Sequence, residues 1–211
     1  MIFPDTQLEQ QLWNKGFKYV VGIDEAGRGP LAGPVCAGAV MINEGSNISE
    51  FVRDSKKMTE KRREEAFEFI VGNSLAFGIC MVGPEKIDRY GIQIAVRMAM
   101  EVALKELESM LGSKAQYLII DGNNVDSIEG YSQTKIKSGD LKHYSISCAS
   151  ILAKVTRDRY MKDISKKYPN YGFEKHVGYG TKIHMEALQK YGPCPIHRRS
   201  FSPIKEMVNN L

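Results

Sequence analysis

Short apolar runs, each bounded by glycine, proline or charged residues, recur along the chain and alternate with longer segments of helical periodicity. Runs rich in β-branched and aromatic residues predict buried strands, because such side chains suit a pleated surface and the flanking breakers limit their length. Five runs fit this description: residues 19–23, 35–42, 74–82, 115–120 and 133–137. The short connection between the first two predicts that they are antiparallel neighbours.

Apolar residues at helical spacing predict the helices between these strands. An amphipathic helix is expected within residues 1–17, with Leu12 and Trp13 on its apolar stripe, and Thr59 is placed to cap another. Three more helices are predicted over residues 85–111 with a break at Gly91, over 143–167 and over 182–190. Strands that alternate with helices in this way indicate an α/β fold.

The chain has 211 residues, enough for one domain with a substantial core, and no repeat, low-complexity segment or linker divides it. We therefore expect a single domain over residues 1–211. No apolar run approaches the roughly 20 residues that span a bilayer, and the N-terminus lacks a secretory signal pattern. The protein is expected to be cytoplasmic and to have no membrane partner.

The four cysteines are far apart in the sequence and form no Cys-x-x-Cys pair, which argues against a disulfide framework and a zinc ribbon. Cys194 and His197 are three residues apart, but two ligands do not complete a tetrahedral zinc site.

Charge is distributed unevenly along the chain. Residues 135–205 contain 15 Lys and Arg against 5 Asp and Glu, whereas the remaining residues contain 14 against 20. A basic half beside an acidic pocket suits a metal-dependent enzyme that acts on a polyanion, with the helical part from about residue 143 to 211 completing a basic substrate groove. The alternative is a basic face that is simply solvated.

The strongest chemical signal is the segment from residue 19 to 35, where an apolar strand is followed by Asp24 and Glu25. Neighbouring side chains on an extended chain diverge, yet their oxygens can still surround a Mg²⁺ ion, which prefers carboxylates and water. The alternative is a solvated acidic turn. Gly27-Arg28-Gly29 follows, where glycines permit close backbone approach and the arginine suits phosphate. The segment lacks the third glycine of a dinucleotide fingerprint, and Pro30 disrupts a helix start there.

Two further acids follow predicted strands. Asp121 comes directly after the fourth strand, and ligands of open α/β sheets gather at the carboxyl ends of strands, so Asp24 and Asp121 are expected to meet. An Asx-type turn is the alternative for Asp121. Asp140 precedes the long helix, where it can act as a cap or a metal ligand. Asp158 lies between Arg157 and Arg159, which favours an ion pair over catalysis.

The loop over residues 170–180 interleaves glycines and Lys175 with four rings: Tyr171, Phe173, His176 and Tyr179. Basic and aromatic side chains mixed in this way suit nucleic-acid contact by charge and stacking. Lys56 and Lys57 precede the Thr59 cap, where they can either meet phosphates or remain solvated.

Several long motifs occur together in one order. They are GIDEAGRGPLAGPV at 22–35, DSKK at 54–57, DGN at 121–123, GD at 139–140, ASILAKVTRD at 149–158, GYGT at 178–181 and PIHRRSF at 195–201. On these motifs the chain closely resembles bacterial ribonuclease HII, the type 2 ribonuclease H family, from about residue 19 to 201. It departs from the usual family pattern at residues 90–96 and at Val177, where lysine is common.

The resemblance implies a ribonuclease H-like mixed five-stranded sheet flanked by helices. It implies that two Mg²⁺ or Mn²⁺ ions are held by Asp24, Glu25, Asp121 and Asp140. The implied reaction is endonucleolytic cleavage of RNA in RNA/DNA hybrids and 5′ of single ribonucleotides in DNA, leaving 3′-hydroxyl and 5′-phosphate ends and serving ribonucleotide removal and repair.

By the same resemblance, Gly27, Arg28 and Gly29 recognise the 2′-hydroxyl, and Tyr179 packs on the adjoining sugar. Candidates for contacts with the nucleic-acid backbone are Lys56, Lys154, Arg198 and Arg199, with helix packing as the alternative for Lys154. The expected partners are an RNA/DNA hybrid and a DNA duplex containing ribonucleotides. A monomer is expected, and residues up to Leu211 show no evident clamp-binding motif.

Two other functions compete with this interpretation. Another ribonuclease H-like nuclease, such as a DNA resolvase, shares acid clusters and a basic groove, but the Gly-Arg-Gly loop beside Asp24 argues against it. A non-catalytic protein that binds RNA/DNA hybrids needs the basic half but not four acids at strand ends.

Overall fold

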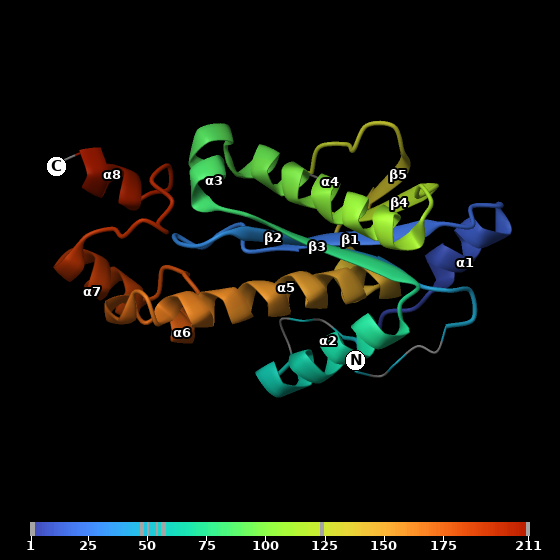
Figure 1. Ribbon diagram of the computed structural model, residues 1–211, viewed down its shortest axis with the longest axis horizontal. Coiled ribbons are helices and arrows are strands. Elements are labelled where there is room, and N and C mark those ends of the chain that lie inside the picture. The colour runs from blue at the N-terminus through green and yellow to red at the C-terminus, as the bar shows by residue number, and fades with distance from the viewer. Residues whose placement is uncertain are drawn as a thin grey trace.

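The computed structural model describes residues 3–46, 49, 51–53, 55, 58–122 and 125–209, and a five-stranded sheet lies at its centre (Figure 1). The strands are β1 (Val20–Ala26), β2 (Val35–Met41), β3 (Ala76–Val82), β4 (Tyr117–Asp121) and β5 (Ser132–Ile136), in the order β3-β2-β1-β4-β5. β1 pairs antiparallel with β2 and parallel with β4. The sheet is therefore mixed, and all five predicted strands are confirmed.

β1 extends further than its apolar run indicates. Asp24 and Glu25 lie inside the strand, opposite Gly38 and Ala37 of β2, instead of following its end. The ladder with β2 continues past the last apolar residue because backbone pairing does not depend on side-chain polarity. The two acids therefore occupy successive positions of a rigid strand, and their side chains point to opposite faces of the sheet.

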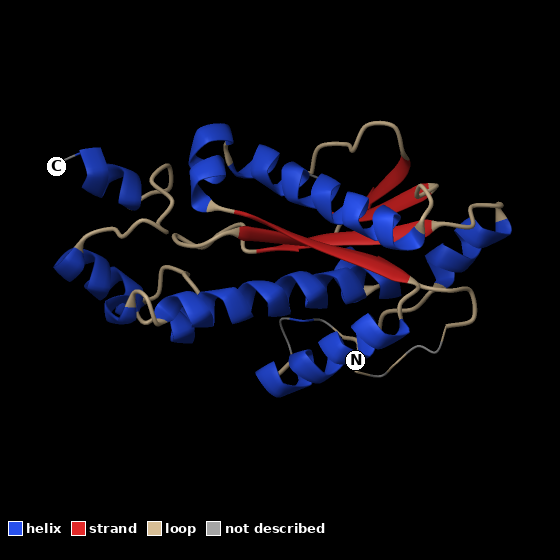
Figure 2. Ribbon diagram, viewed as in Figure 1, coloured by secondary structure: helices blue, strands red, loops and turns tan. Residues whose placement is uncertain are grey.

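Helices cover both faces of the sheet (Figure 2). α3 (Pro84–Tyr90) and α4 (Ile92–Leu111) lie on one side, separated by Gly91 at φ 81°. α5 (Tyr144–Ser165) and α2 (Glu60–Asn73) lie on the other, and the Thr59 hydroxyl caps α2 by accepting from the Arg62 N–H. The predicted break at Gly91 and the Thr59 cap are confirmed.

Glycines let the helices approach the sheet closely. A Cβ atom on Gly38 of β2 would lie 2.4 Å from the Ala149 carbonyl oxygen of α5. On the opposite face, a Cβ atom on Gly78 of β3 would lie 2.0 Å from the Ala103 carbonyl oxygen of α4. These positions exclude every side chain, so both helices pack directly against the strands.

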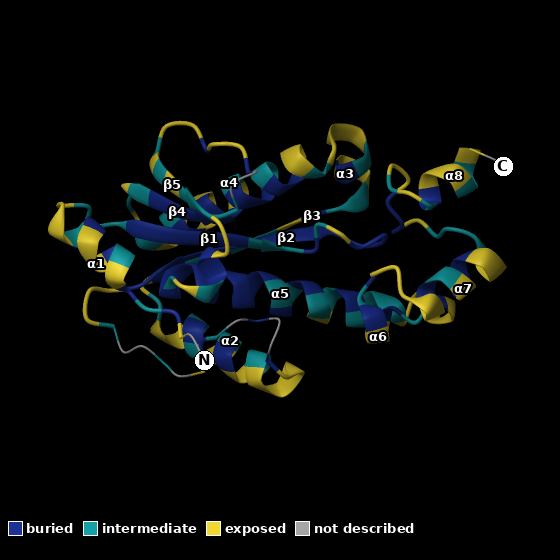
Figure 3. Cartoon of the chain, turned by 180° about the vertical axis from the view of Figure 1, so that it is seen from behind, coloured by how far each residue is buried: buried dark blue, intermediate teal, exposed yellow. Residues whose placement is uncertain are grey.

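The apolar core lies in two layers, one on each face of the sheet, and Figure 3 shows β1, β2 and much of α5 as buried. The N-terminal helix α1 (Gln7–Asn14) closes one edge through Leu12, which is buried beside Val20 and Ile146. None of the helices in the described ranges has the length and hydrophobicity needed to cross a bilayer.

The C-terminal part lies beyond the end of the sheet at which β1 ends (Figure 1). It contains the short 3-10 turn η3 (Pro169–Tyr171), α6 (Phe173–His176), α7 (Lys182–Tyr191) and α8 (Ile204–Asn209), whereas the 3-10 turn η2 (Gly139–Leu141) lies between β5 and α5. These helices share a separate apolar cluster that includes Leu31 and Ala32 of the loop after β1. α6 and α8 were not predicted, because helices of four and six residues are too short to show a period.

Candidate active site

Asp24 lies in the middle of the sheet and is only 4% exposed. One carboxylate oxygen accepts from the Glu25 N–H at 2.7 Å, and the Ser150 hydroxyl of α5 donates a further hydrogen bond to the side chain. Ser150 is itself held by Ser55 at 3.1 Å between the two hydroxyl oxygens. The strand and α5 together fix this carboxylate in one orientation.

Glu25 is half-buried and pairs with Arg28, whose Nη1 lies 3.1 Å from Oε1. The Arg28 Nη2 also donates to the Gln93 side chain of α4 at 2.9 Å. The other Glu25 oxygen, Oε2, is buried and has no hydrogen-bond partner among the described residues. An unpartnered buried carboxylate oxygen is unfavourable, and it fits a group that receives a cation.

Asp121 is the last residue of β4, and the pairing of Ile23 with Ile120 sets it beside Asp24 on the neighbouring strand. Its Oδ1 accepts from the Gly139 N–H at 2.6 Å. Asp140 follows Gly139 in the η2 turn and is 2% exposed. It does not cap α5, because the cap position is His143 and carries no side-chain cap bond.

The four acids influence one another electrostatically. Burial raises the pKa of Asp24 well above its ordinary value, and the negative charges of Glu25, Asp121 and Asp140 raise that pKa further. Burial also raises the pKa of Glu25, and the adjacent Arg28 offsets part of this effect. Like charges gathered in a buried place are relieved either by protonation or by a compensating cation. The expected meeting of Asp24 and Asp121 is confirmed by the strand register.

The donor set fits a hard divalent cation, since it consists of carboxylate oxygens, with Glu25 Oε2 unpartnered. Within the described part of the chain, no three His, Cys, Asp or Glu side chains are already gathered at ligand geometry. The negative charges of Glu25, Asp121 and Asp140 nevertheless act on Asp24.

Two buried arginines support the loop over residues 27–34 by donating hydrogen bonds to its backbone carbonyls. Arg198 is fully buried and donates to the carbonyls of Gly27 at 2.6 Å, Arg28 at 2.7 Å, Gly33 at 3.0 Å and Pro34 at 3.1 Å. Arg157 donates to Pro34 at 2.8 Å and to Ala32 at 3.1 Å. Gly27 has φ 92°, and a Cβ atom there would lie 2.1 Å from Arg157 Nε.

This position corrects the expectation that Arg198 contacts the nucleic-acid backbone. Its guanidinium is engaged with loop carbonyls and has no exposed surface, so its contribution is to the shape of the loop. From sequence, Arg157 is only a possible ion-pair partner of Asp158, and nothing in the sequence indicates its position under the loop. Arginine suits this role because its planar fork makes several hydrogen bonds at fixed angles.

Tyr179 lies beside the same loop. Its ring is 43% exposed, and a Cβ atom built on Gly29 would lie 3.9 Å from ring atom Cε1. The ring also lies 6.0 Å from the Arg157 guanidinium carbon. Residues from two distant parts of the sequence thus form one exposed surface next to Glu25 and Arg28.

The other rings of the 170–180 segment are buried, which corrects the expectation that they stack on nucleic acid. Phe173 is fully buried and Tyr171 and His176 are 7% exposed, whereas Tyr179 is open to solvent. Tyr171 and Phe173 stack on each other with centroids 5.3 Å apart. The sequence pattern did not separate core aromatics from the exposed one.

The remaining basic candidates differ in position. Lys154 of α5 is partly buried and bonds Asp158 at 2.8 Å, so Asp158 forms the expected ion pair, although with Lys154 and Arg63 instead of its sequence neighbours. Arg199 is exposed, and its backbone N–H donates to Asp88 at 2.9 Å. Lys56 and Lys57 lie outside the described residues.

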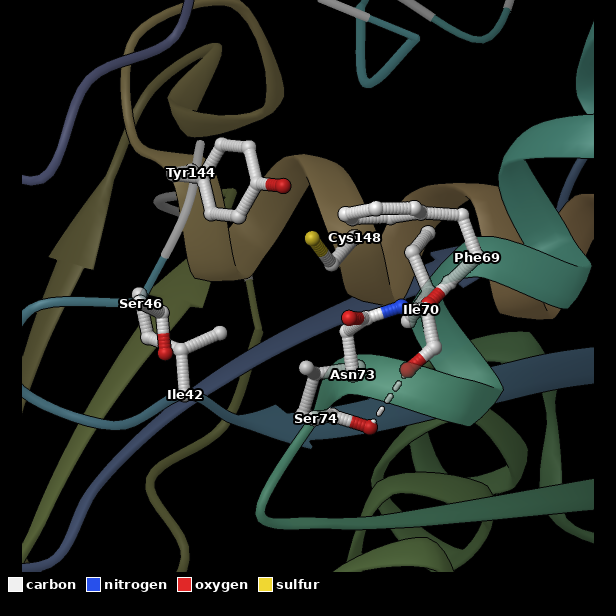
Figure 4. A pocket seen from close by; sticks show the side chains of 9 residues that line it. Ile42, Ser46, Phe69, Ile70, Asn73, Ser74, Tyr144 and Cys148 are labelled. Atoms are coloured by element: carbon white, nitrogen blue, oxygen red, sulfur yellow. Dashed lines mark hydrogen bonds between the residues drawn. The ribbon is translucent and has the colours of Figure 1, made fainter. Parts of the chain in front are cut away.

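A small hollow between α2, β2 and the start of α5 contains none of the four acids (Figure 4). It is lined by Ile70, Tyr144 and Cys148 among others, and Ser74 donates to the Ile70 carbonyl at 2.7 Å. The hollow is a packing feature of the second apolar layer and not part of the acidic site.

Comparisons with known proteins show the family of this chain. The family profile described as Ribonuclease HII matches residues 21–204. A Ribonuclease HII of Caldicellulosiruptor bescii is 51% identical over 195 residues, which are 92% of this chain and 92% of the relative. The Ribonuclease HII of Acholeplasma laidlawii is 46% identical, and the alignment covers 99% of both chains.

Solved structures show the same fold. The ribonuclease H2 of Pyrococcus horikoshii OT3 aligns with a TM-score of 0.75 at 29% identity, covering 90% of this chain and 97% of the other. An Archaeoglobus fulgidus RNase HII, solved as a complex with PCNA, aligns at 0.71 with 23% identity, covering 89% and 96%. With the acids on adjacent strands and the family profile spanning most of its length, the chain belongs to the ribonuclease HII family, the endonucleases that hydrolyse RNA in RNA/DNA hybrids.

Proposed function

We propose that this ribonuclease H also cuts 5′ of single ribonucleotides embedded in duplex DNA and leaves 3′-hydroxyl and 5′-phosphate ends. The observation that carries the proposal is the position of the exposed Tyr179 ring over Gly29, where a Cβ atom would lie 3.9 Å from the ring, next to the strand that bears Asp24 and Glu25. This position, close to the strand that carries the acids, supports a role of the Tyr179 surface in recognising a sugar beside the cleavage site. Removal of misincorporated ribonucleotides follows as the biological task.

Recognition rests on the 2′-hydroxyl, which is the only group that marks a ribonucleotide within a DNA strand. Gly27, Arg28 and Gly29 present the backbone to that hydroxyl, and the absence of a side chain at the exposed Gly29 permits close approach. The Tyr179 ring supplies a flat apolar face for the adjoining sugar. Contacts with the 2′-hydroxyl and with the adjoining sugar select a ribonucleotide by its sugar and not by its base.

The acids hold divalent metal, Mg²⁺ or Mn²⁺, in this proposal. A solved Bst-RNase HIII with 16% identity contains Mn²⁺, and the carboxylates here are suitable ligands for the same kind of ion. When bound, two such ions would activate water and stabilise the leaving oxygen. Asp24 is oriented by Ser150 and by the Glu25 N–H, and Asp121 by the Gly139 N–H.

The basic C-terminal part binds the duplex backbone. Arg199 is exposed beside the loop that Arg198 supports, and Lys154 is 22% exposed on α5. Both suit phosphate contacts, and Lys154 has to exchange its bond with Asp158 to make one. Lys56 is likewise proposed to contact the nucleic-acid backbone. We propose that the protein works as a monomer on this duplex.

The test uses a DNA duplex with one internal ribonucleotide, incubated with Mg²⁺, with Mn²⁺ or with EDTA. We expect a single cut 5′ of the ribonucleotide that requires metal and is absent from an all-DNA duplex and from the Asp24→Asn variant. If a continuous RNA/DNA hybrid is cut but the single ribonucleotide is not, the proposal that residues 27–29 and Tyr179 recognise a single ribonucleotide is refuted. Binding of the duplex without any cutting would indicate a hybrid-binding protein.

A further inference from the structure

We propose that His184 and His197 form a buried positioning relay that fixes Tyr179 against the loop over residues 27–34. This inference rests on the proposed function, because it assigns a task to the surface that Tyr179 forms with Gly29. Neither histidine belongs to the acidic site. Each is at most 1% exposed, and together they connect two segments that are far apart in the sequence.

The relay consists of three hydrogen bonds. His184 Nδ1 lies 2.9 Å from the Tyr179 carbonyl oxygen, and its Nε2 lies 2.9 Å from Nε2 of His197. On the far side, His197 Nδ1 lies 2.9 Å from the Cys194 backbone nitrogen. The His184 ring is also stacked on His176, with centroids 4.5 Å apart, so packing prevents it from rotating.

Elementary hydrogen-bond chemistry fixes the tautomers. The Tyr179 carbonyl only accepts, so His184 must carry its proton on Nδ1 and accept at Nε2. His197 then donates from Nε2 and accepts the Cys194 N–H at Nδ1. The Cys194 carbonyl lies 3.2 Å from the same Nδ1, but the opposite tautomer would direct a His184 lone pair at the Tyr179 carbonyl. With both rings neutral, every bond of the relay is satisfied.

The backbone joins the relay to the loop after β1. Ala32 and His197 form an antiparallel bridge, the Gly33 N–H donates to Ile196 at 2.9 Å, and the Arg198 N–H donates to Leu31 at 2.8 Å. The Leu31 N–H in turn donates to the Gly178 carbonyl at 2.8 Å. Tyr179 and the loop are therefore linked both directly and through the two imidazoles.

The segment that carries Tyr179 needs such support. Val177 has φ 43°, a region that β-branched residues avoid, and Gly178 has φ 89°. A Cβ atom on Gly178 would lie 2.3 Å from the Ala32 carbonyl oxygen. Backbone held in a sparsely populated region persists only where its surroundings determine it. The hydrogen bond from His184 to the Tyr179 carbonyl is one of those determinants.

The test compares two substitutions at one position. His184→Asn keeps an N–H donor close to the place of Nδ1, whereas His184→Phe keeps the ring and removes the donor. We expect His184→Phe to lower kcat/KM on the single-ribonucleotide duplex about tenfold, in line with the cost of misplacing a substrate contact. His184→Asn should stay within about twofold of the unchanged protein. Ile183→Ala, an exposed neighbour on α7, serves as control.

A double-substitution cycle separates positioning from general damage to the fold. In a Tyr179→Ala background, His184→Phe should cause no further loss, because the group it positions is gone. A tenfold loss that persists in that background, or equal losses for His184→Phe and His184→Asn, would overturn the proposal. Thermal unfolding of each variant checks that the proteins compared are folded.

A readout that does not use activity keeps the inference testable if the single ribonucleotide is not cut. Backbone amide order parameters and chemical shifts of residues 178–180 report whether the segment is held. We expect His184→Phe to lower these order parameters and His184→Asn to preserve them. Unchanged order parameters in His184→Phe would refute the relay, whereas failure of the cutting assay with loosened amides would refute only the proposed function.

Discussion

At the residue scale, the site depends on side chains whose charge is poorly solvated. Asp24 is buried beside three other acids, and Arg157 and Arg198 are buried against backbone carbonyls. Each arrangement carries a desolvation cost that neighbouring groups offset. Asp24 serves the function, whereas the two arginines support the loop. Replacing Asp24 and replacing Arg198 are therefore expected to change the stability of the protein in opposite directions.

Replacing Asp24 by asparagine is expected to abolish cleavage and to stabilise the metal-free protein. The substitution removes a negative charge from a buried group of acids and retains a side chain of similar shape. Stability should rise by about 1–3 kcal/mol, the range typical of relieving a poorly satisfied buried polar group. Urea unfolding in EDTA measures this change. A metal-free Asp24→Asn protein that is less stable than the unchanged one would contradict the assigned crowding of charges.

Replacing Arg198 by leucine is expected to destabilise the protein, because four carbonyls lose a hydrogen bond and only Pro34 keeps a donor in Arg157. A cost of about 3–5 kcal/mol corresponds to breaking a buried charged network. Arg199→Leu is the matched control, since its side chain is exposed and the adjacent backbone stays the same. Thermal unfolding compares the two. Equal small losses in both variants would show that Arg198 does not support the loop.

At the element scale, the distances between helices and sheet set the position of the acids. α5 supplies Ser150 to Asp24 and packs against β2 at Gly38, where no side chain separates the two backbones. Because the helix and the strand touch directly, a small displacement of α5 moves the group that orients Asp24.

Gly38→Ala is therefore expected to reduce both stability and activity. The added methyl group meets the Ala149 carbonyl of α5, which cannot rotate away, and overpacking of this kind costs about 1–3 kcal/mol. Gly72→Ala provides the opposite case, because a Cβ atom in that exposed turn of α2 meets nothing within 4 Å. It should stabilise by about 0.5–1 kcal/mol. Chemical denaturation of both variants tests the contrast.

At the scale of the whole molecule, the buried histidines and the buried acids make stability depend on pH in opposite directions. Burial lowers the pKa of His184 and of His197 to about 4, from an ordinary value of 6.5. Between pH 6.5 and 4 the unfolded chain then binds more protons than the folded one, so stability falls as pH falls through this window. The raised pKa of Asp24, caused mainly by burial, acts in the other sense.

A variant with His184→Asn and His197→Gln isolates the histidine contribution. We expect the stability of the unchanged protein to fall by about 6 kcal/mol more than that of the variant between pH 7 and pH 4, since each of the two histidines contributes about 3 kcal/mol. Urea unfolding at a series of pH values gives the two curves, and the acids cancel because both proteins retain them. Parallel curves would mean that the histidines do not stay neutral in the folded state.

Local sequence determined much of this protein. The five strands, the Gly91 break, the Thr59 cap and the long helix α5 follow from periodicity and turn chemistry, which act over a few residues. The four acids and the Gly-Arg-Gly loop stand out because polar residues beside apolar strands are unusual, and the family resemblance follows from contiguous motifs.

Only the tertiary structure decided which polar and aromatic side chains are buried and which are exposed to solvent. Arg198 lies under a loop 164 to 171 positions earlier in the chain, and His184 reaches His197 across 13. Tyr171, Phe173 and Tyr179 look alike in sequence, yet only Tyr179 is open to solvent. The physical reason is that burial is set by contacts between distant segments, whereas helices and strands are set largely by neighbours along the chain.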